Sequence, residues 1–165
     1  MSPAAERDTV RPRITAAAGL VSAVVVLSAL MLLVGGTGSA QIAHTCSATD
    51  RQFINAAQLN MASLSSASED YLHGDAKASE VIDTDRNALD NIRSTGPSDP
   101  SLSKTRAILS AMFVEYGRAV RADQHHKDPG MYIYRAYGLA NFAHDILEQA
   151  QPALKQRGCD VSSLL

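Results

Sequence analysis

The chain has 165 residues, a formal net charge of -2 and a charged fraction of 19%. Aromatic residues make up 5% of it and tryptophan is absent, so the composition favours packed helices over a sheet. Residues 1–13 carry +1 and the remainder -3. An acidic domain without clustered bases lacks the electrostatic footprint of a nucleic-acid-binding protein. Nucleic acid is therefore not expected as a partner.

Residues 14–34 form the most apolar segment of the chain, and no Asp, Glu, Lys or Arg occurs between Ile14 and Thr49. A helix of this length spans about 30 Å, the thickness of the hydrocarbon core of a bilayer. Three arginines precede the segment, so the positive-inside rule places residues 1–13 in the cytoplasm. We expect a single-pass membrane anchor with the C-terminal domain outside the cytoplasm.

The anchor has one alternative, a cleaved signal peptide. Gly38, Ser39 and Ala40 offer small residues where a signal peptidase reads them, and cleavage after Ala40 would make the protein secreted. The apolar segment is longer than most signal-peptide cores, which favours a retained anchor. The predicted organisation is a linker over residues 35–47, a helical domain over 48–160 and a C-terminal tail over 161–165.

Two cysteines stand near the ends of the exported domain, Cys46 at its start and Cys159 near its end. In an oxidising compartment they allow one intramolecular disulfide. It would close a loop of about 113 residues, for which chain entropy predicts about 4 to 5 kcal/mol of stabilisation. Two free thiols or an intermolecular bridge are the alternatives.

Helical periodicity predicts four amphipathic helices, over residues 48–73, 76–94, 98–122 and 130–157, with Pro152 bending or ending the last. Short links make an up-down-up-down four-helix bundle the economical packing. The fold class is therefore all-α, with an N-terminal transmembrane helix followed by an extracytoplasmic bundle closed by one disulfide. The cysteines should share the pole beside the membrane, and the 1–2 and 3–4 turns should form the distal tip.

Asp85 lies in the centre of the apolar arc of the second predicted helix, where an unpaired carboxylate is costly. His144 lies at the edge of the apolar arc of the fourth helix. The two form a candidate buried polar pair, with Tyr116 or Tyr137 as a further donor. The alternative is a rotated or frayed second helix that leaves Asp85 in solvent.

Histidines and acids gather in the two turns expected at the distal tip. His73 and Asp75 occupy one turn, and His125, His126 and Asp128 occupy the other. Imidazole and carboxylate groups suit zinc, copper, nickel or iron. No HxxxH or HExxH spacing occurs, and solvated loop histidines are the alternative interpretation.

Tyrosines surround Arg135 at the start of the fourth helix. Tyr134 falls outside the apolar arc, so Tyr134 and Arg135 are candidate interface residues. Covering the helix terminus is the alternative role. No GxSxG elbow, phosphate-binding glycine loop or CxxC motif occurs, and an isolated Asp and His without a nucleophile indicate no catalytic site. A non-enzymatic protein is therefore expected.

The segment Asp70-Tyr71-Leu72-His73, together with Cys46 and Cys159, resembles exported, disulfide-bonded helical haemophore-like proteins. That resemblance implies haem contacts from tyrosine and histidine. The cysteine-to-tyrosine spacing is longer here, and the fourth helix has no counterpart in the resemblance.

These observations lead to one principal functional prediction and two alternatives. The principal one is an envelope protein whose helical domain is an interaction or accessory module for another membrane or cell-wall component, with no cofactor. The first alternative is a haem or transition-metal protein that uses Tyr71 with the tip histidines, or Tyr137 with His144. The second, an extracytoplasmic sensor, needs a partner for its output because only residues 1–13 are cytoplasmic.

Overall fold

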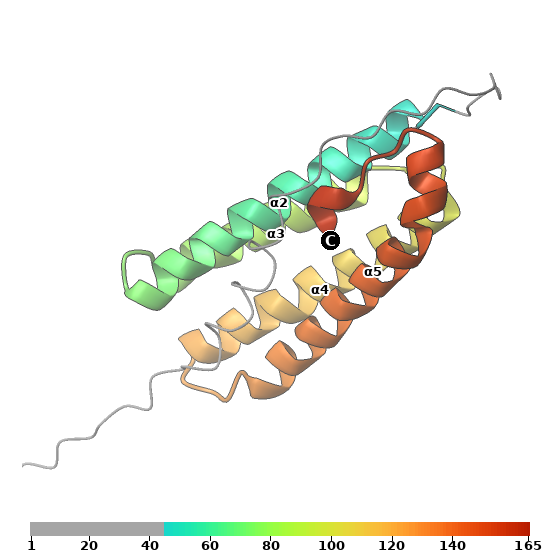
Figure 1. Cartoon of the computed structure of the whole chain (residues 1–165). Coiled ribbons are helices and arrows are strands. Elements are labelled where there is room, and N and C mark those ends of the chain that lie inside the picture. Colours follow the sequence, from blue (N-terminus) through green and yellow to red (C-terminus); the bar gives the residue numbers. More distant parts are fainter. Residues whose placement is uncertain (1–44) are drawn as a thin grey trace, which may run out of the picture.

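A computed structural model describes residues 45–165, and this part of the chain is all-helical (Figure 1). It contains the four predicted α-helices and, in addition, a short 3-10 helix. Their bounds are α2 Ala48–His73, α3 Ala78–Ser94, α4 Pro100–Gln124, α5 Gly130–Gln156 and η1 Ser162–Leu164.

The predicted membrane segment, residues 14–34, and the predicted cleavage site after Ala40 lie outside the described residues. Among the helices of residues 45–165, none combines the length and apolar character needed to cross a bilayer.

Helix boundaries follow from local capping. The Ser47 side chain accepts a hydrogen bond from the Asp50 amide at the start of α2, and Gly74 ends that helix with a φ of 85°, which glycine adopts without strain. The Asp99 carboxylate accepts the amides of Ser101 and Leu102 at the start of α4. The second helix begins at Ala78, two residues later than predicted, and Lys77 at its N-cap provides no side-chain hydrogen bond.

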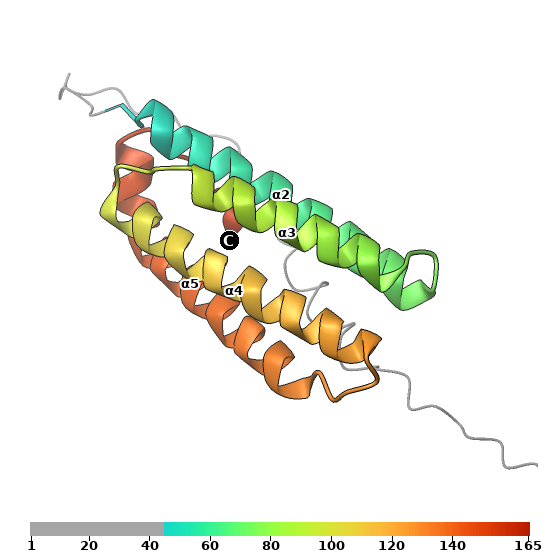
Figure 2. The same cartoon turned by 180° about the vertical axis from the view of Figure 1, so that it is seen from behind.

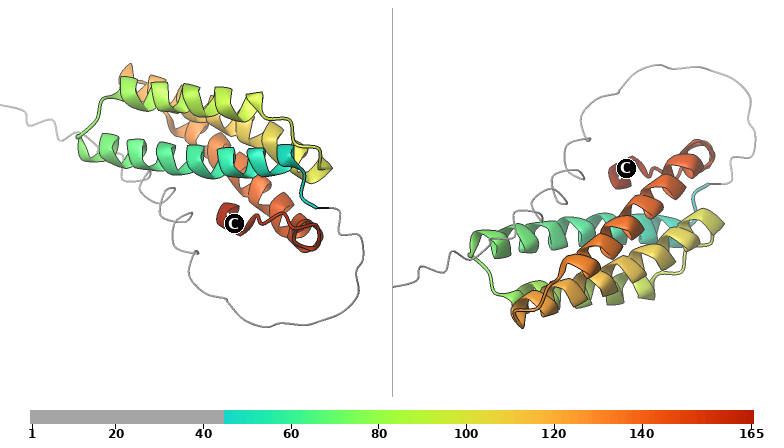
Figure 3. Two further views of the ribbon diagram at one scale, coloured as in Figure 1. Left: turned by 90° about the horizontal axis from the view of Figure 1, so that it is seen from above. Right: turned by 90° about the horizontal axis from the view of Figure 1, so that it is seen from below.

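Successive helices run antiparallel and pack as neighbours along the chain (Figures 1 and 2). α3 lies between α2 and α4, and α5 packs on α4. α2 and α5 do not pack along their lengths, and η1 contacts both of them instead. Figure 3 shows α5 crossing α2 obliquely. The arrangement is therefore a bundle that the C-terminal residues close on one side.

The C-terminal residues belong to the core, which corrects the expectation of a separate tail over 161–165. Val161 is 1% exposed, and Leu164 and Leu165 pack against the buried cluster. Phe53 and Phe113 are fully buried within the same cluster. α5 continues through Pro152 to Gln156, and its last turns change direction in Figures 1 and 2.

One pole of the domain is held by a disulfide between Cys46 and Cys159, as predicted. Beside it the Asp50 carboxylate accepts the amides of Ser98 and Asp99 at 2.7 and 3.0 Å, which fixes the α3–α4 turn to α2. Burial alone would raise the pKa of Asp50, but its hydrogen bonds outweigh burial and lower it. Here this end is called the disulfide pole.

An ion pair also connects the end of α5 to the disulfide pole. Arg157, directly after α5, pairs with the buried Asp99 carboxylate. The start of α2, the α3–α4 turn and the end of α5 are thus joined both covalently and by charged hydrogen bonds. The α2–α3 and α4–α5 turns lie at the opposite end, here called the distal pole (Figure 1).

Candidate functional site

The Asp85 carboxyl group is buried in the distal half of the domain, between α3 and α4. Asp85 is 4% exposed, so the structure decides for burial over solvation. Its Oδ1 atom has no hydrogen-bond partner within residues 45–165. A buried polar oxygen without a partner is costly, which makes Asp85 an exception in an otherwise apolar helix face.

Gly117 of α4 provides the space for this carboxyl group. A Cβ atom built on Gly117 would approach Asp85 Oδ2 more closely than real Cβ contacts allow. The glycine lies inside α4, where its flexibility costs about 1 kcal/mol relative to alanine. The α3–α4 packing therefore depends on a residue without a side chain opposite Asp85.

Burial raises the pKa of Asp85 from 3.8 to about 7, and the positive charges of Arg121 and Arg86 oppose that rise. Transfer of a carboxylate out of water favours its neutral form. Asp85 therefore titrates near neutral pH, well above the pH range in which an exposed aspartate titrates.

Two side-chain hydrogen bonds connect α2 to α4 in the distal half of the domain. Ser68 and the Tyr116 hydroxyl are 2.5 Å apart, and Tyr71 donates to Asp123. Burial raises the pKa of Tyr116, and the Asp85 charge raises it further. The five residues Ser68, Tyr71, Asp85, Tyr116 and Asp123 are here called the polar layer.

Tyr71 was a candidate haem ligand, and the structure gives it another role. Burial, followed by the hydrogen bond to Asp123, raises the pKa of Tyr71 to about 12. A tyrosine ligand binds haem iron through its phenolate oxygen. The environment of Tyr71 disfavours that form and engages its hydroxyl within the polar layer.

The predicted pair between Asp85 and His144 is not formed. The His144 side chain is 45% exposed, and its Nδ1 lies 4.0 Å from Asp145. α3 and α5 pack on different sides of α4, so residues at a similar depth on these two helices do not meet. Tyr137, the other expected donor, is 45% exposed.

His144 does share its surface with two acids. Ligand atoms of His144, Asp145 and Glu148 lie within 4.8 Å of one another on α5. His144 and Glu148 are four residues apart and so lie on the same side of the helix. The three form an exposed cluster with a mixed imidazole and carboxylate donor set.

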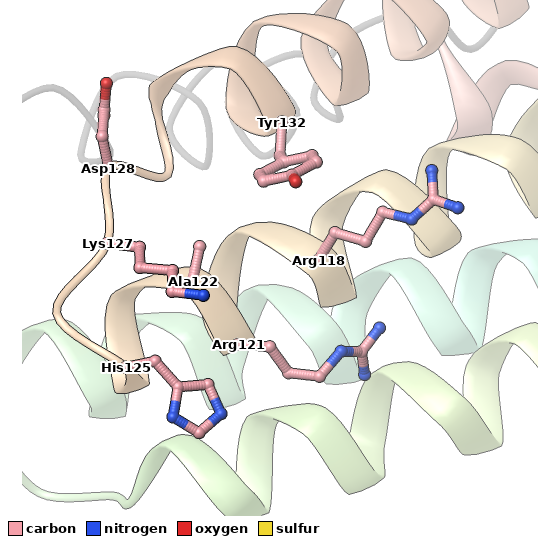
Figure 4. Close-up of a pocket in the computed structure, with 7 residues that line it drawn as sticks. All are labelled: Arg118, Arg121, Ala122, His125, Lys127, Asp128 and Tyr132. Atoms are coloured by element: carbon pink, nitrogen blue, oxygen red, sulfur yellow. The ribbon is translucent and has the colours of Figure 1, made fainter.

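The tip histidines His73, His125 and His126 are exposed at the distal pole and do not gather with acids into a group of potential metal ligands within residues 45–165. His125 instead lines a shallow depression of about 320 Å³ where α4 meets α5 (Figure 4). Its lining residues are Arg118, Arg121, Ala122, His125, Lys127, Asp128 and Tyr132.

The depression is basic in composition, but its charges are partly neutralised. Arg118 donates to Glu115 at 2.5 Å, and Asp128 contributes a negative charge to the lining. Figure 4 shows the guanidinium groups of Arg118 and Arg121 pointing along α4, away from Lys127. The cations therefore do not converge on one point, as a preformed anion site would require.

An exposed apolar stripe runs along the outer side of α5. Met131, Tyr134 and Phe142 are 63%, 78% and 48% exposed. With Gly138 they follow the spacing i, i+3, i+7 and i+11, which places all four within an arc of about 80°. Space around Gly138 is open, with nothing within 4 Å of a Cβ built there. These four residues are here called the α5 stripe.

Cationic side chains flank the α5 stripe. The Lys104 ammonium lies 5.2 Å from the centre of the Phe142 ring, and Arg135 lies 3.9 Å from Glu115. The predicted exposure of Tyr134 and Arg135 is present in the structure. The tyrosine pattern alone does not predict the α5 stripe. It becomes apparent only from the helical spacing that places Met131, Gly138 and Phe142 on the same side of α5 as Tyr134.

Comparison of the chain with protein-family models, with curated proteins and with solved structures gives no match.

Proposed function

We propose that this chain is a membrane-anchored envelope protein whose helical domain, outside the cytoplasm, is a non-enzymatic interaction module for another membrane or cell-wall protein. Anchoring rests on the apolar segment over residues 14–34 and the arginines before it. The α5 stripe is the observation that carries the interaction.

The α5 stripe has the properties of a protein-binding surface. Four of the six large hydrophobic side chains that are exposed within residues 45–165 belong to α5, namely Met131, Tyr134, Tyr137 and Phe142. Aromatic residues, methionine and arginine are enriched in interfaces, and tyrosine loses little conformational entropy on binding. Gly138 lets a partner backbone approach between Tyr134 and Phe142.

Site-specific photo-crosslinking in intact membranes tests this function. A photoreactive phenylalanine in place of Tyr134 should give a discrete adduct with one envelope protein. The same group in place of Asn87, which is exposed on α3, should give none. The Tyr134→Ala variant should weaken co-purification of that partner in mild detergent while its disulfide and helix content stay unchanged. A monomer without adducts from Tyr134 and Phe142 would contradict the proposal.

Transition-metal binding is a second candidate function, favoured by the cluster of His144, Asp145 and Glu148. Imidazole with carboxylate oxygens suits zinc or copper, and further ligands would come from water. Calorimetric titration with Zn²⁺ or Cu²⁺ should show binding that His144→Ala abolishes and His73→Ala leaves intact. Equal heats for both variants would show that His144 is not a ligand. Absence of heat for the wild type would contradict metal binding altogether.

A further inference from the structure

We infer that the domain is a pH-controlled clamp, in which protonated Asp85 holds the α2–α3 hairpin against the α4–α5 hairpin at the distal pole and ionised Asp85 lets the two hairpins separate there. The inference rests on burial, on the close approach of α3 to Gly117 and on the different construction of the two poles. It goes beyond the proposed interaction function and does not depend on it.

The two poles are held together in different ways. At the disulfide pole, the Cys46–Cys159 bond and the Asp99–Arg157 ion pair connect the start of α2 with α4 and the end of α5. Towards the distal pole, the connections between α2 and α4 are the Tyr116 and Tyr71 hydrogen bonds of the polar layer. The disulfide pole therefore acts as the hinge, and the distal pole is the end that can open.

Asp85 is placed where its charge acts on this opening. It lies seven residues from the distal start of α3, and Gly117 lies seven residues from the distal end of α4. The carboxyl group is in contact with the α4 backbone, so a water shell around an ionised Asp85 requires α3 to move away from α4. A protonated carboxyl group has a much smaller cost of burial and can stay between the two helices.

Charged and titratable groups around Asp85 do not neutralise it. From α4, Arg121 and Tyr116 face it, and from α3, its neighbour Arg86 does. Neither arginine forms an ion pair with it within residues 45–165, and burial outweighs both. From α2, Ser68 and Tyr71 reach the polar layer through neutral hydroxyl groups.

Proton linkage sets the size of the effect. The pKa of Asp85 is about 7 in the closed domain, and it returns towards 3.8 when the carboxyl group is hydrated. The ratio of open to closed molecules should therefore rise by up to about tenfold per pH unit between about pH 4 and pH 7, and level off above pH 7.

Electron-spin distance measurements on the full chain in nanodiscs test the clamp. Spin labels are attached to p-acetylphenylalanine at positions 75 and 127, in the two distal turns, which leaves both cysteines in their disulfide. From pH 5 to pH 8 the population at long distance should increase. A second label pair at positions 48 and 155, at the disulfide pole, should keep its distance.

Two variants of α3 distinguish the effect of Asp85 on the pH dependence from the effect of another acid on the same helix. Asp85→Asn should remove the pH dependence and keep the short distance, whereas Asp90→Asn, which alters an exposed acid of α3, should behave as the wild type. Wild-type distances that do not change with pH, or a pH dependence that survives in Asp85→Asn, would overturn the inference. Equal movement of both label pairs would also overturn it, because it would indicate global loosening.

A second measurement does not depend on a variant. The carboxyl carbon-13 shift of Asp85 in the wild-type chain should titrate near neutral pH. A midpoint in the ordinary range of aspartate would overturn the clamp even if Asp85→Asn failed to fold.

Discussion

The Asp85 carboxyl group lies directly against the backbone of Gly117, across the interface between α3 and α4. Because Gly117 has no side chain, it leaves space for the Asp85 carboxyl group inside the α3–α4 interface.

Replacement of Gly117 by alanine should destabilise the domain. The new methyl group would overlap Asp85 Oδ2, and overpacking of a core costs about 1 to 3 kcal/mol. The matched control is Gly138→Ala, an exposed position in α5 where the gain in helix propensity should stabilise by about 0.5 to 1 kcal/mol. Urea unfolding of both variants measures the contrast. Two stabilised variants would show that the Gly117 contact relaxes freely.

Stability should fall as the pH rises from about 4 to about 7. Folding raises the pKa of Asp85 from 3.8 to about 7, so the folded state binds the proton more tightly than the unfolded chain between these values. This contribution is complete below about pH 4, decreases up to about pH 7 and is constant above. The free energy of unfolding should be on the order of 1 to 3 kcal/mol larger at pH 5 than at pH 8.

The Asp85→Asn and Asp90→Asn variants provide the reference for this pH dependence. Urea titrations at pH 5, 6, 7 and 8 should give a flatter profile for Asp85→Asn and an unchanged one for Asp90→Asn. A wild-type profile that rises towards pH 8 would contradict the assignment, because it would require a carboxylate whose ionisation stabilises the fold.

Removal of the disulfide should cost up to about 4 to 5 kcal/mol, the chain-entropy value for a large loop, since the bond joins cysteines 113 residues apart. Wild-type protein under reductant and the Cys46→Ala, Cys159→Ala double variant should unfold at similar urea concentrations, well below that of the oxidised protein. If reduction left the unfolding midpoint unchanged, the disulfide pole would owe its stability to its polar contacts alone.

Asp99→Ala should destabilise by about 1 to 2 kcal/mol, because it removes the N-cap of α4. It also leaves Arg157 without its acidic partner. Asp160→Ala is the control, since Asp160 is exposed and bonds only to Ser162 within residues 45–165. Thermal unfolding followed by circular dichroism should separate the two variants, and equal melting temperatures would refute a structural role for the Asp99 cap.

Local sequence rules predicted most helix boundaries, since their causes are local. Gly74 after His73, and Asp99 before Pro100, define an end and a start by backbone chemistry that needs no tertiary contact. The disulfide followed from the cysteine count and from the poles of an antiparallel bundle. Helical periodicity also placed Asp85 on the inward side of α3.

The neighbours of Asp85 could not be predicted in this way. Periodicity tells which side of a helix is buried but not which helix covers it. Depth along the bundle alone therefore suggests the wrong partner, His144, for Asp85. Gly117 gave no signal because it lies inside a regular helical pattern. Val161 was missed for a different reason, since a short segment after a helix has no period to read.

The packing of the half-buried Leu164 and Leu165 against the core has a practical consequence for production of this protein. A hydrophilic purification tag fused directly to Leu165 would favour exposure of this residue and so oppose its contact with the core. A tag is better placed before residue 1, or after a C-terminal spacer long enough for Leu165 to keep its contacts with the core.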